Sequence, residues 1–176
     1  MIIYFLRHAN AGEPVSNPKK DEKRALDEEG IEQCGNVGRA LAALEVQVEV
    51  ILTSPLKRAS QTAALVANEM GYEGKLQLVD ALRPSASFAD FRRVLEKYVK
   101  HDSMMVVGHN PSLSEFLGRC ISETGCEAAV DLKKGAVAKV DMGRHSAVLQ
   151  WCLTPKILRT LYSAAAESAR PKTSRK

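Results

Sequence analysis

Four side chains that suit a phosphoryl group stand where apolar runs of the chain end. Arg7 and His8 end the first run, Arg58 comes shortly after the second, and His109 closes a third. In a parallel α/β sheet, ligands bind beyond the carboxyl ends of the strands. If the three runs are strands, two imidazoles and two guanidiniums meet at one edge. Guanidinium groups match phosphate oxygens, and a neutral imidazole can attack phosphorus.

The elements that must position these residues alternate between short β-type runs and longer helical patterns. We predict strands over 2–6, 50–52, 76–79, 104–107, 136–142 and 147–153. Apolar residues at helical spacing predict helices over 31–44, 59–70, 88–98 and 113–121. A last helix is expected after Pro155, from 156 to about 169. A loop is expected over 12–27, which holds two prolines and a mixed charge run.

This alternation predicts a single α/β domain of three layers, in which helices cover both faces of a mostly parallel mixed sheet. Only residues 143–146 join the last two strands, so these strands should form a C-terminal antiparallel hairpin. We expect the domain to cover 1–169 and the basic residues 170–176 to form a flexible tail.

Composition narrows the class of protein. The chain of 176 residues is 45% hydrophobic and 26% charged, as globular domains are. No apolar run approaches the ~20 residues that span a bilayer, and no signal peptide is evident, so a cytoplasmic monomer is expected. The net charge of +4 lies largely in the tail, and no basic stripe is interleaved with aromatic residues. Neither nucleic acid nor membrane is therefore an expected partner.

Two of the expected strand exits also begin helices. Ser54-Pro55 and Asn110-Pro111 each place an N-cap residue before a proline at the first helical position. A helix N-terminus favours a bound anion, and Arg7 and Arg58 would add permanent positive charge. With two arginines nearby, the pKa of His8 should be low enough to leave it neutral and nucleophilic near pH 7. His109 would bind a phosphoryl oxygen beside Asn110.

The remaining histidines and cysteines invite other interpretations. Paired histidines can bind a metal ion, but neighbouring arginines oppose a cation and no carboxylate or cysteine lies at ligand spacing, so no metal or other cofactor is expected. His101 and His145 are expected to face solvent. The four cysteines form no C-x-x-C pair and are expected to be buried thiols: Cys34, Cys120, Cys126 and Cys152.

Three further segments have expected environments. Trp151 and the pair Met104-Met105 are expected in the core. The charge run 19–24 is expected to be a solvated face. Because this run follows the strand that ends at His8, a position beside the pocket, where it would meet a partner protein, stays open.

Three segments together resemble the signatures of the histidine phosphatase superfamily. They are Leu6-Arg-His-Ala9, Ser54-Pro-Leu-Lys-Arg-Ala-Ser-Gln-Thr62 and Val107-Gly-His-Asn110. The short chain is similar to the SixA-type phosphohistidine phosphatase branch. The resemblance implies a phosphoglycerate-mutase-like fold, with His8 as nucleophile and a catalytic phosphate pocket made by Arg7, Arg58 and His109.

The chain departs from the family pattern where the substrate is concerned. Ala9 stands where the family usually has glycine, and Ala11 and Pro14 stand where mutase-like members have a serine and an asparagine that hold phosphate. Those members also carry an acidic proton donor in an insertion after the third strand, where this chain has only residues 80–87. A sugar alkoxide needs a general acid to leave, whereas imidazole leaves a phosphoramidate more readily.

We therefore expect a phosphatase that hydrolyses phosphohistidine on a phosphotransfer-type partner protein through a covalent intermediate on His8. Inorganic phosphate or sulfate is expected to bind in the same pocket. Candidates for a general acid are Asp80, Glu13 and Glu115. Two alternatives stay open, namely a phosphatase of a small phosphorylated metabolite and a catalytically silent module that binds phosphorylated partners.

Overall fold

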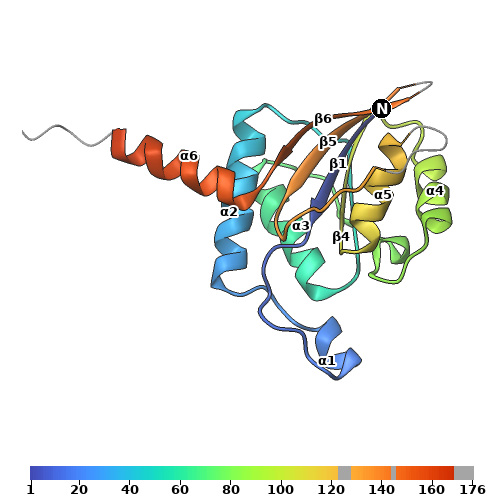
Figure 1. Cartoon of the computed structure of the whole chain (residues 1–176), viewed down its shortest axis with the longest axis horizontal. Coiled ribbons are helices and arrows are strands. Elements are labelled where there is room, and N and C mark those ends of the chain that lie inside the picture. The colour runs from blue at the N-terminus through green and yellow to red at the C-terminus, as the bar shows by residue number, and fades with distance from the viewer. Residues whose placement is uncertain (123–127, 144–145, 169–176) are drawn as a thin grey trace, which may run out of the picture.

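A mixed sheet runs through the molecule in the order β3-β2-β4-β1-β5-β6 (Figure 1). The computed structural model describes residues 1–122, 128–143 and 146–168. The strands of the sheet are β1 (Ile2–Arg7), β2 (Val50–Thr53), β3 (Gln77–Leu78), β4 (Ser103–Gly108), β5 (Val137–Met142) and β6 (Ala147–Leu153). All six lie where the apolar runs predicted strands, although β3 is shorter than expected.

The register of the paired strands determines where the candidate residues lie at the edge of the sheet. β1 and β4 pair in parallel, with Arg7 opposite Gly108. β2 pairs in parallel with the other side of β4, and β3 continues this direction. β5 runs antiparallel to β1, and β6 runs antiparallel to β5. The mostly parallel sheet and its C-terminal hairpin are therefore confirmed.

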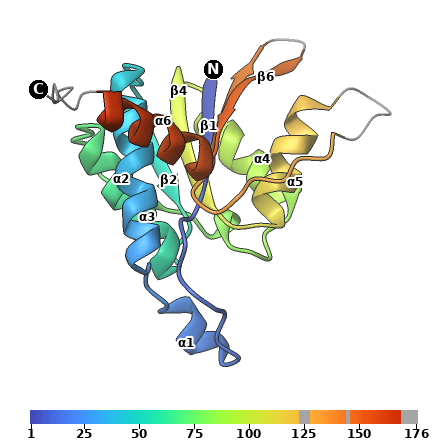
Figure 2. The same ribbon diagram turned by 60° about the vertical axis from the view of Figure 1, so that its left-hand side comes forward.

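Helices cover both faces of this sheet. They are α1 (Pro18–Glu22), α2 (Glu28–Ala43), α3 (Lys57–Glu69), the 3-10 helix η1 (Asp80–Leu82), α4 (Phe88–Lys97), α5 (Ser112–Ile121) and α6 (Pro155–Ser168). Figures 1 and 2 show α2, α3 and α6 on one side and α4 and α5 on the other, with α1 beyond the carboxyl ends of the parallel strands. None of the helices within the described ranges is long and apolar enough to cross a membrane.

The core consists of two apolar clusters, one on each face of the sheet. Tyr4 and Leu6 pack on the α2–α3 side, whereas Ile3 and Phe5 pack on the α4–α5 side. Because successive strand residues point to opposite faces, an unbroken apolar run is what a strand covered on both sides requires. The three-layer prediction is confirmed, and Met104 and Met105 are both fully buried.

The loop predicted over 12–27 contains a short helix. Asn17 caps α1 by accepting a hydrogen bond from the amide of Lys20, and Pro18 occupies its first position. Proline fits there because the first helical amides have no partner within the helix. The prediction of an uninterrupted loop was wrong. Residues 19–24 are all charged and offer no apolar spacing from which a helix could be predicted.

Two predicted helix caps were also wrong. α3 begins at Lys57 with Leu56 in the cap position, so Ser54 lies before the helix. α5 begins at Ser112, Pro111 occupies its cap position, and the Asn110–Pro111 peptide bond is cis. Serine and asparagine before proline suit a cap on propensity alone. Here the Ser54 hydroxyl accepts from the amide of Leu56 at 3.4 Å, which lies before the first turn of α3, and the Asn110 side chain bonds Leu132 and Ser114. α6 begins at Pro155, one residue before the position expected.

Part of the predicted apolar stripe on α2 faces solvent. Ile31 is 53% exposed and Leu44 is 54% exposed, whereas Cys34, Val37 and Leu41 are buried. Both exposed residues stand at the ends of α2, because Ile31 lies in its first turn and Leu44 follows its last residue, Ala43. Their assignment to the core was wrong.

Other environments are mixed. Cys34 is buried, but Cys120 is half-buried and Cys152 is exposed, so burial of all the thiols was not correct. Trp151 is half-buried beside Tyr4 at the edge of the core, with 5.9 Å between ring centroids. His101 was expected to face solvent, but it is half-buried with Nδ1 3.2 Å from the carbonyl oxygen of Tyr98. Cys126, His145 and the predicted tail 170–176 lie outside the described residues.

Candidate active site

The two histidines and two arginines selected from the sequence lie together at the carboxyl ends of β1, β2 and β4. The ring centroids of His8 and His109 are 4.9 Å apart. The amide of His8 donates to the carbonyl of Gly108 at 3.0 Å, which fixes the two strand exits to each other. Arg58, at the second position of α3, is 5% exposed, whereas His8 and His109 are 6% and 2% exposed. The convergence expected from strand topology is therefore present.

The hydrogen bond of His8 determines which ring nitrogen is nucleophilic. Nδ1 lies 2.8 Å from the carbonyl oxygen of Ala9. Because a carbonyl can only accept, Nδ1 carries the proton of the neutral ring and Nε2 carries a lone pair. The pKa of His8 is lowered to about 4, first by burial and then by the charges of Arg58 and Arg7, against the raising effect of the hydrogen bond to Ala9. The ring is neutral, as expected, but desolvation rather than the arginines is the largest cause.

His109 is oriented by a residue whose role the sequence did not indicate. Its Nε2 lies 2.9 Å from Oγ of Ser54, while its buried Nδ1 has no partner in the described structure. The pKa of His109 is lowered to about 2, mainly by burial and in addition by His8 and Arg58. When the Ser54 hydroxyl donates to Nε2, the single ring proton lies on Nδ1 as an unused donor. Ser54 therefore positions a histidine instead of capping a helix.

The two arginines also present unused donors. Nη1 of Arg7 donates to the carbonyl of Leu132 at 2.7 Å, and Nη1 of Arg58 donates to the carbonyl of Asp21 at 2.9 Å. The Nε atoms of both arginines are buried without a partner among the described residues. An unsatisfied buried donor costs about 1–3 kcal/mol. Such unused donors in one pocket are what an anion with several oxygens would satisfy.

Asp21 on α1 is the main pocket residue that the sequence analysis missed. Its carboxylate accepts from Nη1 of Arg58 at 3.1 Å and from Nε of Arg24 at 2.8 Å. Burial alone would raise the pKa of Asp21, but the hydrogen bonds of Arg24 and of the Val15 amide, with the charge of Arg58, lower it overall. The ionised carboxylate fastens α1 over Arg58. The charge run 19–24 thus borders the pocket and is not only a solvated face.

Lys134 adds a further cation to the pocket. Its ammonium donates to Oδ1 of Asn10 at 2.8 Å, and its charge contributes to the lowered pKa of His8. Asn110, by contrast, uses both ends of its side-chain amide within the protein. It donates to the carbonyl of Leu132 at 3.0 Å and accepts from Oγ of Ser114 at 2.8 Å. A contact between Asn110 and substrate stays a prediction.

The three candidate acids are engaged elsewhere or exposed. Asp80 accepts from Nε of Arg83 at 2.6 Å, and Glu115 pairs with Arg119 at 3.0 Å. Glu13 is exposed. Across the described ranges, no group of three or more histidine, cysteine, aspartate or glutamate residues is arranged to hold a metal ion.

Comparison with known proteins identifies the family of the chain. Residues 3–85 match the model of the histidine phosphatase superfamily, branch 1. An uncharacterized protein of Picosynechococcus sp. is 33% identical over 147 residues, which cover 81% of this chain and 86% of that protein. The chain belongs to the histidine phosphatase superfamily. The match covers β1, α1, α2, β2 and α3, and so includes three of the four selected pocket residues.

Solved structures show the fold shared by this histidine phosphatase superfamily member. The protein histidine phosphatase SixA complexed with tungstate aligns with a TM-score of 0.78 at 21% identity, over 90% of this chain and 99% of that one. The putative phosphohistidine phosphatase SixA from Agrobacterium tumefaciens has a TM-score of 0.72 at 22% identity, over 88% and 98% of the two chains. A phosphoglycerate mutase from Bacillus anthracis aligns at 0.71 with 13% identity, over 90% and 95%. The phosphoglycerate-mutase-like fold is thus confirmed.

Proposed function

We propose that this protein is a phosphatase that hydrolyses phosphohistidine on a partner protein through a covalent phosphohistidine on His8. One observation carries the proposal. The bond from Nδ1 of His8 to the Ala9 carbonyl leaves a lone pair on Nε2, in a pocket where Arg7, Arg58 and His109 each keep a buried nitrogen without a partner among the residues that the structure describes. A nucleophile and unused N–H donors in one pocket suit phosphoryl transfer.

The reaction proceeds in two displacements. In the first, the Nε2 lone pair of His8 attacks phosphorus, the bond from phosphorus to the substrate imidazole breaks, and that nitrogen keeps the electron pair and takes up a proton from solvent water. Arg7, Arg58 and Nδ1–H of His109 stabilise the charge on the equatorial oxygens. In the second, water attacks phosphorus, the bond to Nε2 breaks, and inorganic phosphate leaves with the neutral His8 restored.

The nature of the leaving group favours phosphohistidine over a phosphate ester. Asp21 is the carboxylate whose charge acts on His109, and its lowered pKa keeps it ionised and unable to donate a proton near pH 7. Asp80 and Glu115 are held by arginines. Imidazole leaves without strong acid assistance, whereas an alkoxide does not. The structural likeness to SixA phosphohistidine phosphatases supports the same substrate class.

A small phosphorylated metabolite is the second candidate, because the fold also occurs in a putative α-ribazole-5'-P phosphatase from Escherichia coli. That structure aligns with a TM-score of 0.67 at 17% identity, over 88% of this chain and 97% of that one. A substrate panel separates the two candidates. Efficient turnover of phosphosugars without action on phosphohistidine peptides would favour the metabolite.

The decisive experiment supplies a ³²P-labelled phosphohistidine protein, quenches the reaction early and locates the label. We expect acid-labile label on His8, absent from a folded His8→Ala variant and retained in a His101→Ala control. Binding of the phosphoprotein without transfer of label or release of phosphate would reject the enzyme in favour of a silent binding module.

A further inference from the structure

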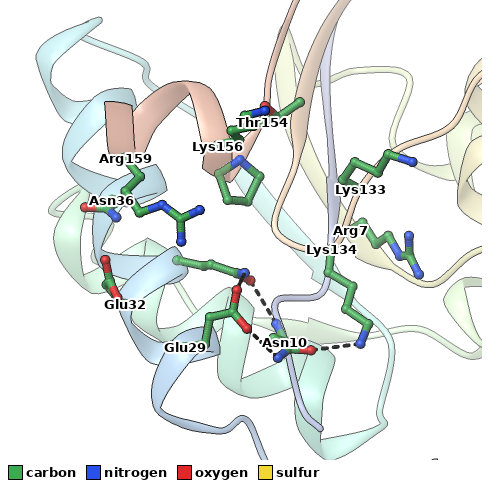
Figure 3. Close-up of a pocket in the computed structure, with 12 residues that line it drawn as sticks. Arg7, Asn10, Glu29, Glu32, Asn36, Lys133, Lys134, Thr154, Lys156 and Arg159 are labelled. Carbon is green, nitrogen blue, oxygen red and sulfur yellow. Dashed lines mark hydrogen bonds between the residues drawn. The ribbon is translucent and has the colours of Figure 1, made fainter. Parts of the chain in front are cut away.

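A cleft lies next to the phosphate pocket and is larger than a phosphoryl group requires. It encloses about 590 Å³ between the end of β1, the first turns of α2, the segment before β5 and the start of α6 (Figure 3). Arg7 lines this cleft and also belongs to the phosphate pocket. Asn10, two residues after His8, forms part of its floor. The cleft therefore begins where the phosphoryl site ends.

The wall of the cleft is strongly basic. Two acidic side chains, Glu29 and Glu32, face a larger set of basic ones, namely Arg7, Lys133, Lys134, Lys156 and Arg159. Glu29 is already committed, because its carboxylate accepts from Nδ2 of Asn10 at 2.8 Å and from Nε2 of Gln33 at 3.1 Å. The positive charge is thus in excess and only partly compensated within the protein.

Two of the cations on α6 are uncommitted. Lys156 and Arg159 are exposed, and neither forms an ion pair with any residue in the described ranges. In Figure 3 the guanidinium of Arg159 extends from α6 into the cleft, and Lys134 enters from the opposite side toward Asn10. The ammonium of Lys134 bridges the two sites, because it bonds Asn10 and its charge also acts on His8.

We infer that the cleft binds an acidic segment of the phosphoprotein substrate, next to its phosphorylated histidine. The inference rests on the proposed function and names the partner's chemistry. A substrate polypeptide that runs from the phosphohistidine past Arg7 and Asn10 enters the cleft, where its carboxylates contact Lys156 and Arg159. Complementary charge of this kind accelerates encounter and selects the partner. A volume of 590 Å³ fits several side chains, whereas the phosphoryl group fills only the pocket beyond Arg7.

The test uses three phosphohistidine substrates and two charge-reversed variants. The substrates are a peptide with glutamates beside the phosphohistidine, the same peptide with glutamines instead, and free phosphohistidine. The variant Lys156→Glu/Arg159→Glu reverses the cleft. The control Lys97→Glu/Lys100→Glu makes the same charge change before β4, at the opposite end of the sheet. Phosphate release gives kcat/KM at low and at high salt.

We expect the unmodified protein to prefer the glutamate peptide by about tenfold at low salt, with the preference lost as salt screens the charges. The cleft variant should lose that preference and still hydrolyse free phosphohistidine at the normal rate, while the control variant keeps it. Equal kcat/KM for both peptides, or equal losses in both variants, would overturn the inference. If the cleft variant slowed free phosphohistidine equally, the cleft would act on the catalytic pocket and not on a segment of the partner. Failure of the proposed function would differ, because the unmodified protein would then release no phosphate from any of the three substrates.

Discussion

Mild acid should destabilise this protein through His8 and His109. Both rings are buried and neutral, and burial lowers their pKa values from 6.5 to about 4 and about 2. A histidine whose pKa is lower in the folded than in the unfolded state stabilises the fold fully above pH 6.5. That stability is lost as pH falls through 6.5 toward the folded values, because the unfolded chain takes up the protons first.

The size of the effect follows from the two shifts. Between pH 7 and pH 5, linkage gives a loss of roughly 2 kcal/mol for each ring, and about 4 kcal/mol for the pair. Unfolding free energies of single domains are about 5–15 kcal/mol, so the loss is a large fraction of the total. His109 should account for most of any further loss below pH 4, because its folded pKa is the lower of the two.

Denaturant unfolding at pH 7 and pH 5 measures this difference directly. The variants His8→Asn and His109→Asn should each reduce the loss by about half, and the double variant should nearly abolish it. The half-buried His101 supplies the control, since His101→Asn removes a histidine outside the pocket and should keep the full dependence. If His109→Asn unfolded with the same pH dependence as the unmodified protein, the buried neutral imidazole would not be the source of the effect.

Three further sets of substitutions test how the pocket and its supporting backbone are built. Arg7→Ala and Arg58→Ala should each lower kcat/KM for phosphohistidine by about 10²–10³, the usual result of losing a donor to the transition state, and near-normal rates would refute the pocket. Asp21→Asn removes the ion pair with Arg58 at 3.1 Å and should lower kcat/KM by about tenfold with the fold intact by circular dichroism; an unchanged rate would show that the Asp21 carboxylate does not position Arg58. A Cβ on Gly30 would lie 2.0 Å from the carbonyl oxygen of Asn10, whereas one on Gly35 would meet only the end of Arg39 at 3.5 Å. Gly30→Ala should therefore destabilise by about 1–3 kcal/mol and Gly35→Ala should stabilise by up to about 1 kcal/mol, and denaturant midpoints moving in the same direction would contradict this.

Much of the fold could be predicted because its central strands have few alternatives. Each of the runs 2–6 and 104–107 is apolar throughout, so both sides must be covered and the strands must be internal. The helical stripes were less informative. Ile31 has the same spacing from Cys34 as a core residue would, but it lies in the first turn of α2 and is 53% exposed.

The residues of the site that follow directly after strands could be predicted from the sequence. The residues that act through a partner far away in the chain could not. His8 and His109 follow adjacent strands, so topology alone brings them together. Asp21 pairs with Arg58 across 37 positions of the chain, and a charge run without its partner resembles an ordinary solvated surface. Ser54 before proline suits a helix cap as well as a histidine contact, and only the position of His109 decides between them.

Alanine at position 9, where the family usually has glycine, does not disturb the orientation of His8, the proposed nucleophile, because that orientation depends on the backbone of residue 9. The carbonyl of Ala9 accepts from His8, and the amide of Ala9 donates to Oγ1 of Thr62 at 3.0 Å. Thr62 in turn donates to the carbonyl of Arg58 at 2.7 Å, within α3. One segment thus orients His109 through Ser54, supplies the Arg58 guanidinium, and holds the backbone that sets the tautomer of His8. The segment from Ser54 to Thr62 therefore holds both histidines in position. It serves the proposed reaction in this way although it contains no nucleophile.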